Sequence, residues 1–417
     1  MPRILPDVEP LRVSREFRLL WAGQLISGSG SALRLVAVPY QVYLLTGSSL
    51  AVGLLGLFAA IPLIVFSLWG GVIADRVDRR RMLLATNVCL ALVSLTLAVS
   101  TELGLASVPV LYALTAIGSS FTALDQPARG ALAPSLVERR LIPAAMALNQ
   151  TQFQIATVVG PAVAGVLIAR LGLAPAYWVD TTTFAIGIVL VFLMRTPPRD
   201  MTVIHAAPMR ALVDGMRFLQ SRPLLLATMS VDFFATFFAV SRAVMPYFAD
   251  RVFAVGPEGL GLLFAAPGAG ATVVALTSGW TNGVRRKGLG VLVSVAIFGL
   301  AMGAFGFLPA TGFVAGLALL AIAQGADTVS SIFRHTILQL ETPDELRGRL
   351  SAINLVFVAG GPQLGQVESG VIAALWSPEA SMVTGGLACV GVVLVAHALV
   401  PHVASYRADL GLSQATT

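Results

Sequence analysis

The chain has 417 residues and a formal net charge of +6, and 56% of its residues are hydrophobic while only 12% are charged. A soluble globular protein carries about 25% charged residues, so this chain has more apolar side chain than a water-soluble fold can bury. The composition therefore excludes a water-soluble fold and indicates a membrane protein. At about 20 residues for each membrane-spanning helix, the length is sufficient for about twelve helices with short connections.

Long apolar runs recur along the chain at the spacing of membrane-spanning helices. The first six cover 17–45, 50–73, 82–101, 108–132, 147–169 and 175–194. Six more cover 224–248, 258–279, 288–308, 313–338, 352–375 and 379–400. Backbone polar groups in lipid must be satisfied within a helix or a closed barrel, and these runs lack the period-two alternation of barrel strands. The sequence therefore predicts an all-α membrane protein with twelve transmembrane helices.

Basic residues gather on one side of this arrangement. If the N-terminus is cytoplasmic, the outer loops hold only Arg170 and Arg251, four basic residues lie inside spans, and the other 21 of the 27 are cytoplasmic. This distribution satisfies the positive-inside rule, so the basic charge records orientation and gives no reason to expect a nucleic acid partner. We expect a multi-pass protein of a bacterial cytoplasmic (inner) membrane with both termini in the cytoplasm.

The two sets of six spans are related by an internal repeat. A shift of 205 residues aligns Arg129 with Arg334 and preserves several glycines of the fifth and eleventh spans. Both halves start on the same side of the membrane, as in transporters with parallel repeats, which bind substrate between the halves and alternate access by rocking. The sequence predicts an N-terminal six-helix bundle, a cytoplasmic linker and a C-terminal six-helix bundle with a short tail, at residues 1–195, 196–222 and 223–417 in turn.

The loop after the second span reads GGVIADRVDRRR over 70–81. It resembles the signature loop of the major facilitator superfamily, although Asp78 stands where that family usually has glycine. The residues at matching positions are Gly71, Asp75, Arg76, Arg79 and Arg80. The resemblance implies a gate, in which the aspartate caps a neighbouring helix N-terminus and the arginines pair with acidic groups to hold the cytoplasmic side shut. A plain positive-inside loop is the alternative.

A glycine-proline motif, GPAVAG, lies in the fifth span at 160–165. It is similar to the motif in the fifth helix of proton-coupled exporters of the same superfamily, with Ala164 in place of a glycine. Small residues and proline bend a helix and admit close packing against a neighbour. We therefore expect Gly160, Pro161 and Gly165 to pack against another helix, and the resemblance implies exchange against protons.

The whole chain resembles one branch of this superfamily, which contains the enterobactin exporter and macrolide and multidrug efflux proteins. The resemblance is carried by FRLLWAGQLIS, DQPARGALAPSLV and ILQLETPDELRGRLSAIN, at 17–27, 125–137 and 337–354. It implies a secondary active transporter, not an enzyme, that exports small hydrophobic or amphipathic compounds of multidrug or macrolide type by proton-coupled alternating access. A siderophore exporter is the alternative; an importer of the same fold and a non-transporting membrane sensor stand behind it.

Eight of the charged side chains inside the predicted spans are candidates for a functional role, because a charge at mid-bilayer costs at least about 2.5–3.5 kcal/mol. Four are of each sign, which favours mutual pairing. These candidates for substrate binding or proton coupling are Arg34, Asp125, Arg129, Asp232, Arg242, Asp327, Arg334 and Glu368. Asp125 precedes Arg129 by four residues, which places the two on one helical face with the acid first and predicts a structural or gating pair.

Arg34 and Arg242 occupy equivalent places in the first span of each half, which lines the central cavity in the superfamily. Either the two arginines attract an anionic or catechol-bearing substrate, or they pair with buried carboxylates and hold the halves together. Burial favours the neutral form of a carboxyl group, which can then carry a proton. Asp232 and Glu368 are our first candidates for the proton carrier and Asp327 is the third.

The sequence contains no phosphate-binding loop, no paired-acid metal motif and no HExxH motif. We therefore expect no catalytic residues, no metal and no cofactor. We expect the chain to act as a monomer whose partners are a small-molecule substrate, protons and the lipid bilayer.

Overall fold

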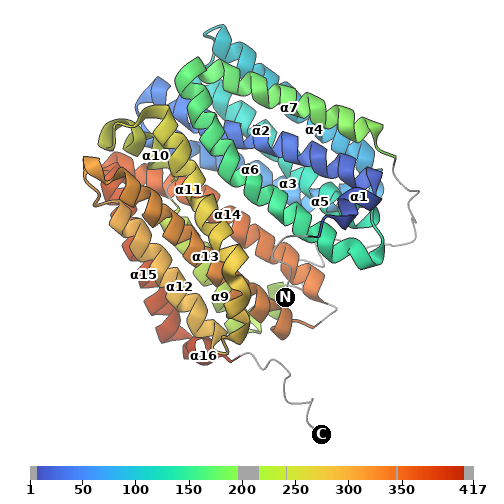
Figure 1. Cartoon of the computed structure of the whole chain (residues 1–417). Coiled ribbons are helices and arrows are strands. Elements are labelled where there is room, and N and C mark those ends of the chain that lie inside the picture. Colours follow the sequence, from blue (N-terminus) through green and yellow to red (C-terminus); the bar gives the residue numbers. More distant parts are fainter. Residues whose placement is uncertain (1–6, 196–215, 241, 344–345, 408–417) are drawn as a thin grey trace. The chain divides into compact units, whose positions relative to one another are not determined.

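The computed structural model describes residues 7–195, 216–240, 242–343 and 346–407. Within these ranges the side chains are described except at 68–76, 347–349, 351–352 and 355–356. Helices dominate the described residues, and no strand occurs among them (Figure 1). The predicted all-α class is confirmed.

Six long helices follow the short α1 (Glu9–Val13) in the first half. They are α2 (Arg15–Thr46), α3 (Ser49–Arg76), α4 (Arg79–Glu102), α5 (Val108–Ser135), α6 (Ile142–Leu171) and α7 (Leu173–Leu193). A 3-10 turn at Arg139–Leu141 precedes α6. Local signals set the ends of α2: the Ser14 side chain accepts from the Phe17 N–H at its start, and Gly47 ends it in the left-handed region with φ of +63°.

The second half begins with a helix that is interrupted. α9 (Pro223–Ala239) is followed by a 3-10 turn, by α10 (Met245–Tyr247) and by a π-helical turn at Phe248–Val252. The remaining helices are α11 (Gly256–Thr277), α12 (Lys287–Phe305), α13 (Phe313–Glu341), α14 (Arg347–Leu375), α15 (Pro378–Leu399) and α16 (Pro401–Ser405). Further 3-10 turns lie at Ser278–Gly283 and Ala310–Gly312.

Twelve long helical segments therefore occur in the described part of the chain, counting α9 to Val252 as one. Ten of them are long and apolar enough to cross a membrane. The other two, α2 and α14, have 32 and 29 residues, which is ample length for a span, but their composition is more polar. The twelve segments match the twelve predicted runs to within a few residues at most ends.

The seventh span differs from the continuous helix that its apolar run predicts. Val240 leaves the helical region with φ of −86° and ψ of 93°, and the 3-10 turn Arg242–Val244 follows. Pro246 lacks the N–H that would bond the carbonyl of residue 242 in a continuous helix. A shift of 207 residues aligns Pro39 with Pro246. Pro39 lies inside the unbroken α2, so the proline alone does not account for the interruption.

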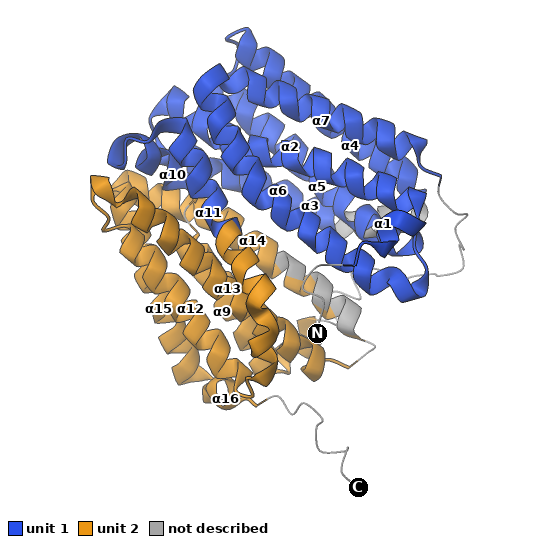
Figure 2. Cartoon of the chain, viewed as in Figure 1, with its two compact units in different colours: residues 1–205, 243–268 blue, residues 206–242, 269–417 orange. Residues whose placement is uncertain are grey.

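The chain folds into two compact units (Figure 2). Unit 1 comprises residues 1–205 and 243–268, and unit 2 comprises residues 206–242 and 269–417. The units are defined by packing, whereas the predicted domains are defined by counting spans, and the predicted boundaries stay a prediction. The chain passes between the units inside two spans, at Arg242 and at Gly268.

The helix pairs within the two units correspond. In unit 1, α2 packs against α6 and α7, and α4 packs against α7. In unit 2, α9 packs against α14 and α15, and α12 packs against α15. These are the partners that the repeat of 205 residues predicts for two copies of one bundle, so the internal repeat is visible in the packing as well as in the sequence.

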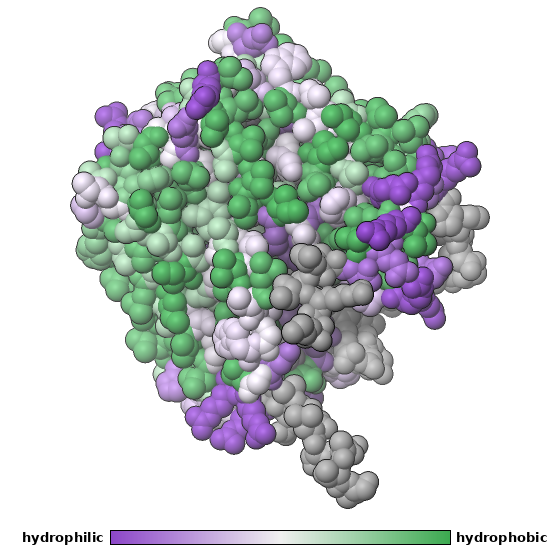
Figure 3. All heavy atoms as spheres, viewed as in Figure 1, coloured by the Kyte–Doolittle hydropathy of each residue, from purple (hydrophilic) through white to green (hydrophobic). Residues whose placement is uncertain are grey.

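Large apolar side chains cover much of the outer surface (Figure 3). Leu276, Val314 and Leu399 are 68%, 75% and 76% exposed, and they lie on three different long helices. Soluble monomers rarely expose apolar patches larger than a few hundred Å², so these surfaces belong in lipid. The chain is a multi-pass membrane protein.

Candidate functional site

An ion pair lies inside unit 1 between α2 and α7. Nη1 of Arg34 is 3.6 Å from Oδ2 of Asp180. Ser94 on α4 joins both groups, because its Oγ accepts from Arg34 Nη1 at 3.0 Å and donates to Asp180 Oδ2 at 2.6 Å. The Asp180 side chain is completely buried, and its Oδ1 has no hydrogen-bond partner among the described residues. The cluster is electrically balanced and ties three helices together.

The sequence expectation for Arg34 did not include this partner. Asp180 was not among the candidate residues, although it lies inside an apolar helix of 21 residues. The rule that selected the other eight charges, a charge within a predicted span, would have selected Asp180 as well. The contact with Ser94 carries no comparable sequence signal, because a serine in a membrane helix commonly bonds its own helix.

A row of polar side chains continues from this cluster along α2. Tyr177, fully buried on α7, donates to Gln41 Oε1 at 2.8 Å. Gln41 Nε2 in turn donates to Thr101 Oγ1 on α4 at 2.9 Å. The guanidinium of Arg34 also lies 5.8 Å from the centre of the Phe184 ring. The α2, α4 and α7 interface of unit 1 is thus polar and internally satisfied along much of its length.

The second charged pair of unit 1 lies on α5. Asp125 Oδ2 contacts Arg129 Nε, and Asp125 Oδ1 accepts from Thr86 Oγ1 of α4 at 2.6 Å. A hollow of about 210 Å³ beside Arg129 is lined by side chains from α2, α4, α5 and α7, including Gln24 and Asn87. Asn87 Oδ1 is buried without a partner among the described residues. The predicted pair exists in the structure and faces a small polar hollow.

The charged cluster of unit 2 is not balanced in the same way. Arg334 of α13 contacts Asp232 of α9, and its Nη2 lies 3.6 Å from Oδ1 of Asp327, seven residues earlier on its own helix. The other oxygen of Asp327 accepts from Gln324 Nε2 at 2.9 Å. Two carboxyl groups therefore share one guanidinium.

A hollow of about 330 Å³ adjoins this cluster within unit 2. Its lining includes Arg334 itself and the polar side chains of Thr228, Ser331, His335 and Asn354. His335 is exposed. The hollow gives the shared arginine a polar surrounding on the side away from the apolar packing.

Glu368 and Arg242 have no ionic partner in the part of the chain that the structure describes. Glu368 of α14 is half-buried, and its Oε2 is buried without a hydrogen bond. Arg242 has an exposed side chain, although the next three residues, Ala243 to Met245, are buried. Within the described part of unit 2, one intramembrane residue of each sign is thus without an ionic partner, whereas Arg34 and Arg129 of unit 1 both have a carboxylate.

Two of the described arginines in the segment that resembles the superfamily signature bond main-chain carbonyls. Arg79 Nη1 donates to the carbonyl oxygen of Ala131 at 2.9 Å. Arg80 Nε donates to the carbonyl of Val191 at 3.1 Å, and Arg80 Nη2 donates to that of Phe192. These carbonyls lie near the C-terminal ends of α5 and α7, where unpaired C=O groups and the negative end of the helix dipole favour cations. Arg79 and Arg80 therefore both bond main-chain carbonyls near helix ends, and their predicted pairing with acidic groups stays a prediction.

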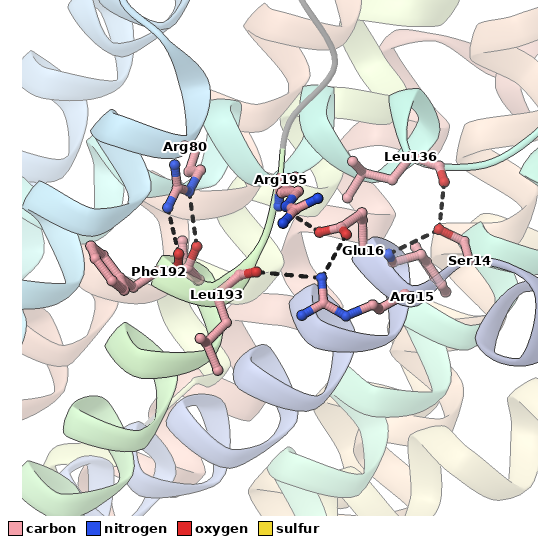
Figure 4. A network of polar contacts seen from close by, with 10 residues as sticks. Ser14, Arg15, Glu16, Arg80, Leu136, Phe192, Leu193 and Arg195 are labelled. Carbon is pink, nitrogen blue, oxygen red and sulfur yellow. Dashed lines mark hydrogen bonds and ion pairs between the residues drawn. The ribbon is translucent and has the colours of Figure 1, made fainter.

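Figure 4 shows how the end of α7 is held. Beside Arg80, Arg15 donates from Nη1 to the carbonyl of Leu193 at 3.5 Å and to Glu16 Oε1 at 2.9 Å. Glu16 Oε2 accepts the backbone N–H of Arg195 at 2.6 Å. The starts of α2 and α4 thus fasten the end of α7 at the point where the chain leaves for the predicted linker. The side chains of Gly71, Asp75 and Arg76 lie outside the described residues, as do residues 196–215 of that linker.

The glycine-proline motif of α6 packs closely on two sides. A Cβ on Gly160 would lie 3.2 Å from the carbonyl oxygen of Ser29 in α2. A Cβ on Gly165 would lie 2.7 Å from the Pro257 oxygen and 2.9 Å from Gly261 Cα, both at the start of α11. The structure therefore uses Gly160 and Gly165 for close backbone approach, and Pro161, buried in the same helix, lies between them.

Comparisons with known proteins agree over nearly the full length. The model of a family described as transmembrane secretion effectors matches residues 7–411. The chain is 30% identical over 394 residues to the enterobactin exporter EntS of Shigella boydii serotype 18, which covers 94% of each chain. The structure is similar to that of a mutant of the nucleoside transporter NupG, with a TM-score of 0.78, 10% identity and coverage of 93% of this chain and 100% of that one. It is also similar to the xylose transporter XylE from E. coli, with a TM-score of 0.70, 14% identity and coverage of 94% and 96%. At such identities the likeness to solved structures shows the fold alone.

Proposed function

Because the chain belongs to the transmembrane secretion effector family of the major facilitator superfamily, we propose that it exports small hydrophobic or amphipathic compounds in exchange for protons. It is a membrane transporter with two pseudo-symmetric six-helix halves and not an enzyme. The proposal concerns the direction of transport, the cargo and the coupling ion.

The proposal of proton coupling rests on Arg334 of unit 2, which two carboxyl groups share. With Asp232 and Asp327 both ionised around Arg334, the cluster holds one uncompensated negative charge inside a membrane span. Such a charge is expensive in lipid, and two carboxyl groups that compete for one cation favour a state in which one of them is protonated. The pair therefore suits the binding of one exchangeable proton.

The geometry also links this proton to helix packing. Asp232 lies on α9 and Arg334 on α13, so their contact joins two helices, whereas Asp327 lies on the same helix as Arg334. A proton on Asp327 leaves Arg334 to Asp232 alone and strengthens the link between the helices. A proton on Asp232 has the opposite effect, because Arg334 is then held by Asp327 within α13. The position of one proton thus sets how firmly α9 is tied to α13.

Glu368 is the alternative proton carrier. A half-buried carboxyl with an unpartnered oxygen is better accommodated in its neutral form than as an anion. Its protonation would break no contact that the structure records among the described residues, so it offers no direct connection to helix movement. For this reason we place the coupling proton on the Asp232 and Asp327 pair.

A siderophore of the enterobactin type is the second candidate cargo. The observation that favours it is the relative at 30% identity over 94% of both chains, whose name is that of an enterobactin exporter. The family description, transmembrane secretion effector, supports export and names no cargo. We further propose that the chain acts as a monomer in a bacterial inner membrane with both termini in the cytoplasm, because its basic residues follow the positive-inside rule.

The signature loop is proposed to take part in gating on the cytoplasmic side. Arg80 and Arg15 fasten the end of α7 to the starts of α4 and α2, and the last two turns of α3 hold Gly71, Asp75 and Arg76 at the spacing of the superfamily motif. Replacement of Asp75 by Asn is expected to impair transport while leaving expression intact. Unchanged transport in that variant would contradict the gating role.

Transport in reconstituted vesicles tests the central claim. Purified protein in proteoliposomes, with an imposed pH gradient and a pH-sensitive dye inside, is given erythromycin or enterobactin. Proton movement that depends on the added compound supports exchange, and the sign of the movement together with the orientation of the protein gives the direction. If the compound moves without any proton movement, the proposed coupling is wrong.

Three variants locate the proton. Asp327→Asn and Asp232→Asn are expected to abolish substrate-dependent proton movement, and Glu368→Gln is expected to retain it. Thr328→Val serves as the control on α13, because Thr328 only bonds the carbonyl of Gln324 on its own helix. Loss of coupling in Glu368→Gln alone would move the proton site to that residue.

A further inference from the structure

The first-span arginines of the two halves differ in their bonding partners. Arg34 in α2 has both a carboxylate and a hydroxyl acceptor, from Asp180 and Ser94. Arg242, at the corresponding place in the seventh span, has neither a hydrogen bond nor an ion pair with any described residue. Among the described residues, the repeat therefore carries one arginine with a counterion and one without.

The cause lies in the helices that would supply the counterions. A shift of 205 residues takes Ser94 to Gly299 in α12 and Asp180 to Gly385 in α15. A Cβ on Gly299 would lie 2.8 Å from the carbonyl oxygen of Gly386, and a Cβ on Gly385 would overlap the carbonyl oxygen of Phe238 in α9. Unit 2 therefore packs backbone against backbone where unit 1 holds an acid, and a carboxylate has no room there.

The three described carboxylates inside the predicted spans of unit 2 form no ion pair with Arg242. Asp232 and Asp327 are held by Arg334, and Glu368 forms no ion pair with any described residue. Within its span, Arg242 lies on the order of 15 Å from the end at Val252, taking the rise of an α-helix. A guanidinium at this depth needs water or an anion beside it.

The side chain of Arg242 lies at the interruption of the seventh span. The helix ends at Ala239, Val240 is extended, and Arg242 opens a short 3-10 turn. Its side chain is exposed while the three residues after it are buried. Discontinuous helices of this kind occur where transporters bind their substrates. In α2, by contrast, Arg34 lies inside a continuous helix and is only 16% exposed.

We propose that Arg242 binds an anionic group of the cargo, such as a carboxylate or a catecholate, and that Arg34 is a structural residue with no contact to the cargo. Guanidinium matches both groups, because its N–H donors lie in a planar fork that can reach two oxygens. Aromatic side chains lie five and nine residues earlier on α9, where Phe237 and Phe233 stack with ring centres 6.2 Å apart and Phe233 meets Phe357 of α14 edge-on. The class of cargo that fits is an aromatic or amphipathic anion. The inference rests on the proposed export function, which implies that a cargo is bound, but not on proton coupling.

Binding of two dyes with opposite charge tests this inference. Carboxyfluorescein is an anion and rhodamine 123 is a cation, and both share a xanthene ring system. Fluorescence polarisation with purified protein in detergent measures binding without a membrane or a proton gradient, so the result is independent of the coupling experiment. We expect the unaltered protein to bind the anionic dye more tightly than the cationic dye.

The variants separate charge recognition from folding. Arg242→Gln is expected to weaken binding of the anionic dye about tenfold, the effect of losing one charge-assisted contact, and to change binding of the cationic dye by less than about twofold. Arg242→Lys is expected to retain most of the preference because it keeps the charge. Arg251→Gln is the matched control, since Arg251 is an exposed arginine near the end of the same span.

Three results would overturn the proposal. They are the absence of measurable binding or preference for the anionic dye in the unaltered protein, an equal loss for both dyes in Arg242→Gln, and an equal loss in Arg251→Gln. If Arg242→Gln does not purify as a folded protein, Arg242→Lys with and without competing inorganic phosphate decides, because phosphate should displace the anionic dye from an arginine or lysine but leave the cationic dye bound.

Discussion

Ser94 donates a hydrogen bond to Asp180 across the interface of α4 and α7, with 2.6 Å between Oγ and Oδ2. The same Oγ accepts from Arg34, so one hydroxyl group orients both members of an ion pair. At the corresponding crossing of α12 and α15 the contact is made by glycine backbone instead. The same helix crossing therefore occurs in both halves of the repeat, with an ion pair in unit 1 and close backbone packing in unit 2.

Loss of the Asp180 charge is expected to destabilise unit 1 strongly. Asp180→Asn leaves the guanidinium of Arg34 without a counterion in a buried position, and breaking a buried ion pair from one side costs about 3–5 kcal/mol. Thermal unfolding in detergent should show a clear decrease in the midpoint. The double variant Arg34→Gln with Asp180→Asn should lose less than the sum of the two single changes, since the groups are in contact.

The matched control for that experiment is the pair of Asp250 and Arg251, whose side chains are exposed and whose Oδ2 and Nε lie 3.7 Å apart. A surface pair contributes about 0–1 kcal/mol, so Asp250→Asn should leave the midpoint nearly unchanged. An equal decrease in Asp250→Asn and Asp180→Asn would contradict a special role of the buried pair.

Close approach of α6 and α11 predicts that the glycines between them cannot accept a methyl group. In Gly165→Ala the new Cβ would lie 2.7 Å from the Pro257 oxygen, which is closer than Cβ atoms approach, so the helices must separate. Overpacking of this kind costs about 1–3 kcal/mol. The midpoint of thermal unfolding is expected to fall in this variant and in Gly261→Ala.

Gly130 provides the opposite case. It lies inside α5, and a Cβ there would meet nothing within 4 Å. Gly130→Ala should therefore stabilise the helix by about 0.8–1.0 kcal/mol, the difference in helix propensity between the two residues. A decrease in stability for Gly130→Ala equal to that for Gly165→Ala would show that the distinction by available space is wrong.

Arg80 is expected to matter where its neighbour Arg81 does not. Both carry the same charge at the start of α4, but Arg80 donates to the carbonyls at the end of α7 while the Arg81 side chain is exposed. Arg80→Gln removes a cation from a helix C-terminus, worth about 0.3–1 kcal/mol and up to about 2 kcal/mol when partly buried. We expect a lower unfolding midpoint for Arg80→Gln than for Arg81→Gln. Identical midpoints would mean that the cap contributes no stability.

Lys287 is the sole lysine of the chain and is expected to resist chemical modification. Its side chain is 2% exposed, its Nζ donates to the carbonyl of Thr281 at 3.1 Å, and the ammonium lies 5.3 Å from the centre of the Phe333 ring. An amine-reactive ester should therefore modify Lys287 in denatured but not in folded protein, as read by peptide mass mapping. The variant Arg286→Lys supplies an exposed amine as a positive control. Rapid modification of Lys287 in the folded protein would contradict its burial.

The sequence was a good guide to the helices because lipid imposes a simple rule. Each span must be a long apolar helix, so the runs at 108–132 and 313–338 appear as α5 and α13 with ends shifted by a few residues. The break at Val240 could not be foreseen in this way. Arg242 and Pro246 follow it closely, but in α2 Arg34 and Pro39 stand at a similar spacing inside an unbroken helix, so these residue types alone do not predict the interruption.

Charged partners were harder to predict than charged positions. The i and i+4 spacing indicates the contact of Asp125 with Arg129, since both lie on one helix. Contacts between helices, such as Asp232 with Arg334, depend on which faces meet and carry no spacing signal. Arg80 shows the same limit, because its acceptors are main-chain carbonyls, which look alike in every sequence.

The placement of residues 243–268 in unit 1 has a consequence for a protein severed in its middle. A chain cut between residues 205 and 206 yields two pieces, and the second piece contains a segment that completes the fold of the first. Neither piece contains all of the residues of unit 1. The two pieces are therefore complementary fragments rather than independent domains. Co-expression of 1–205 with 206–417 should reconstitute a complete fold, whereas 1–205 alone lacks the surface that Gly165 packs against.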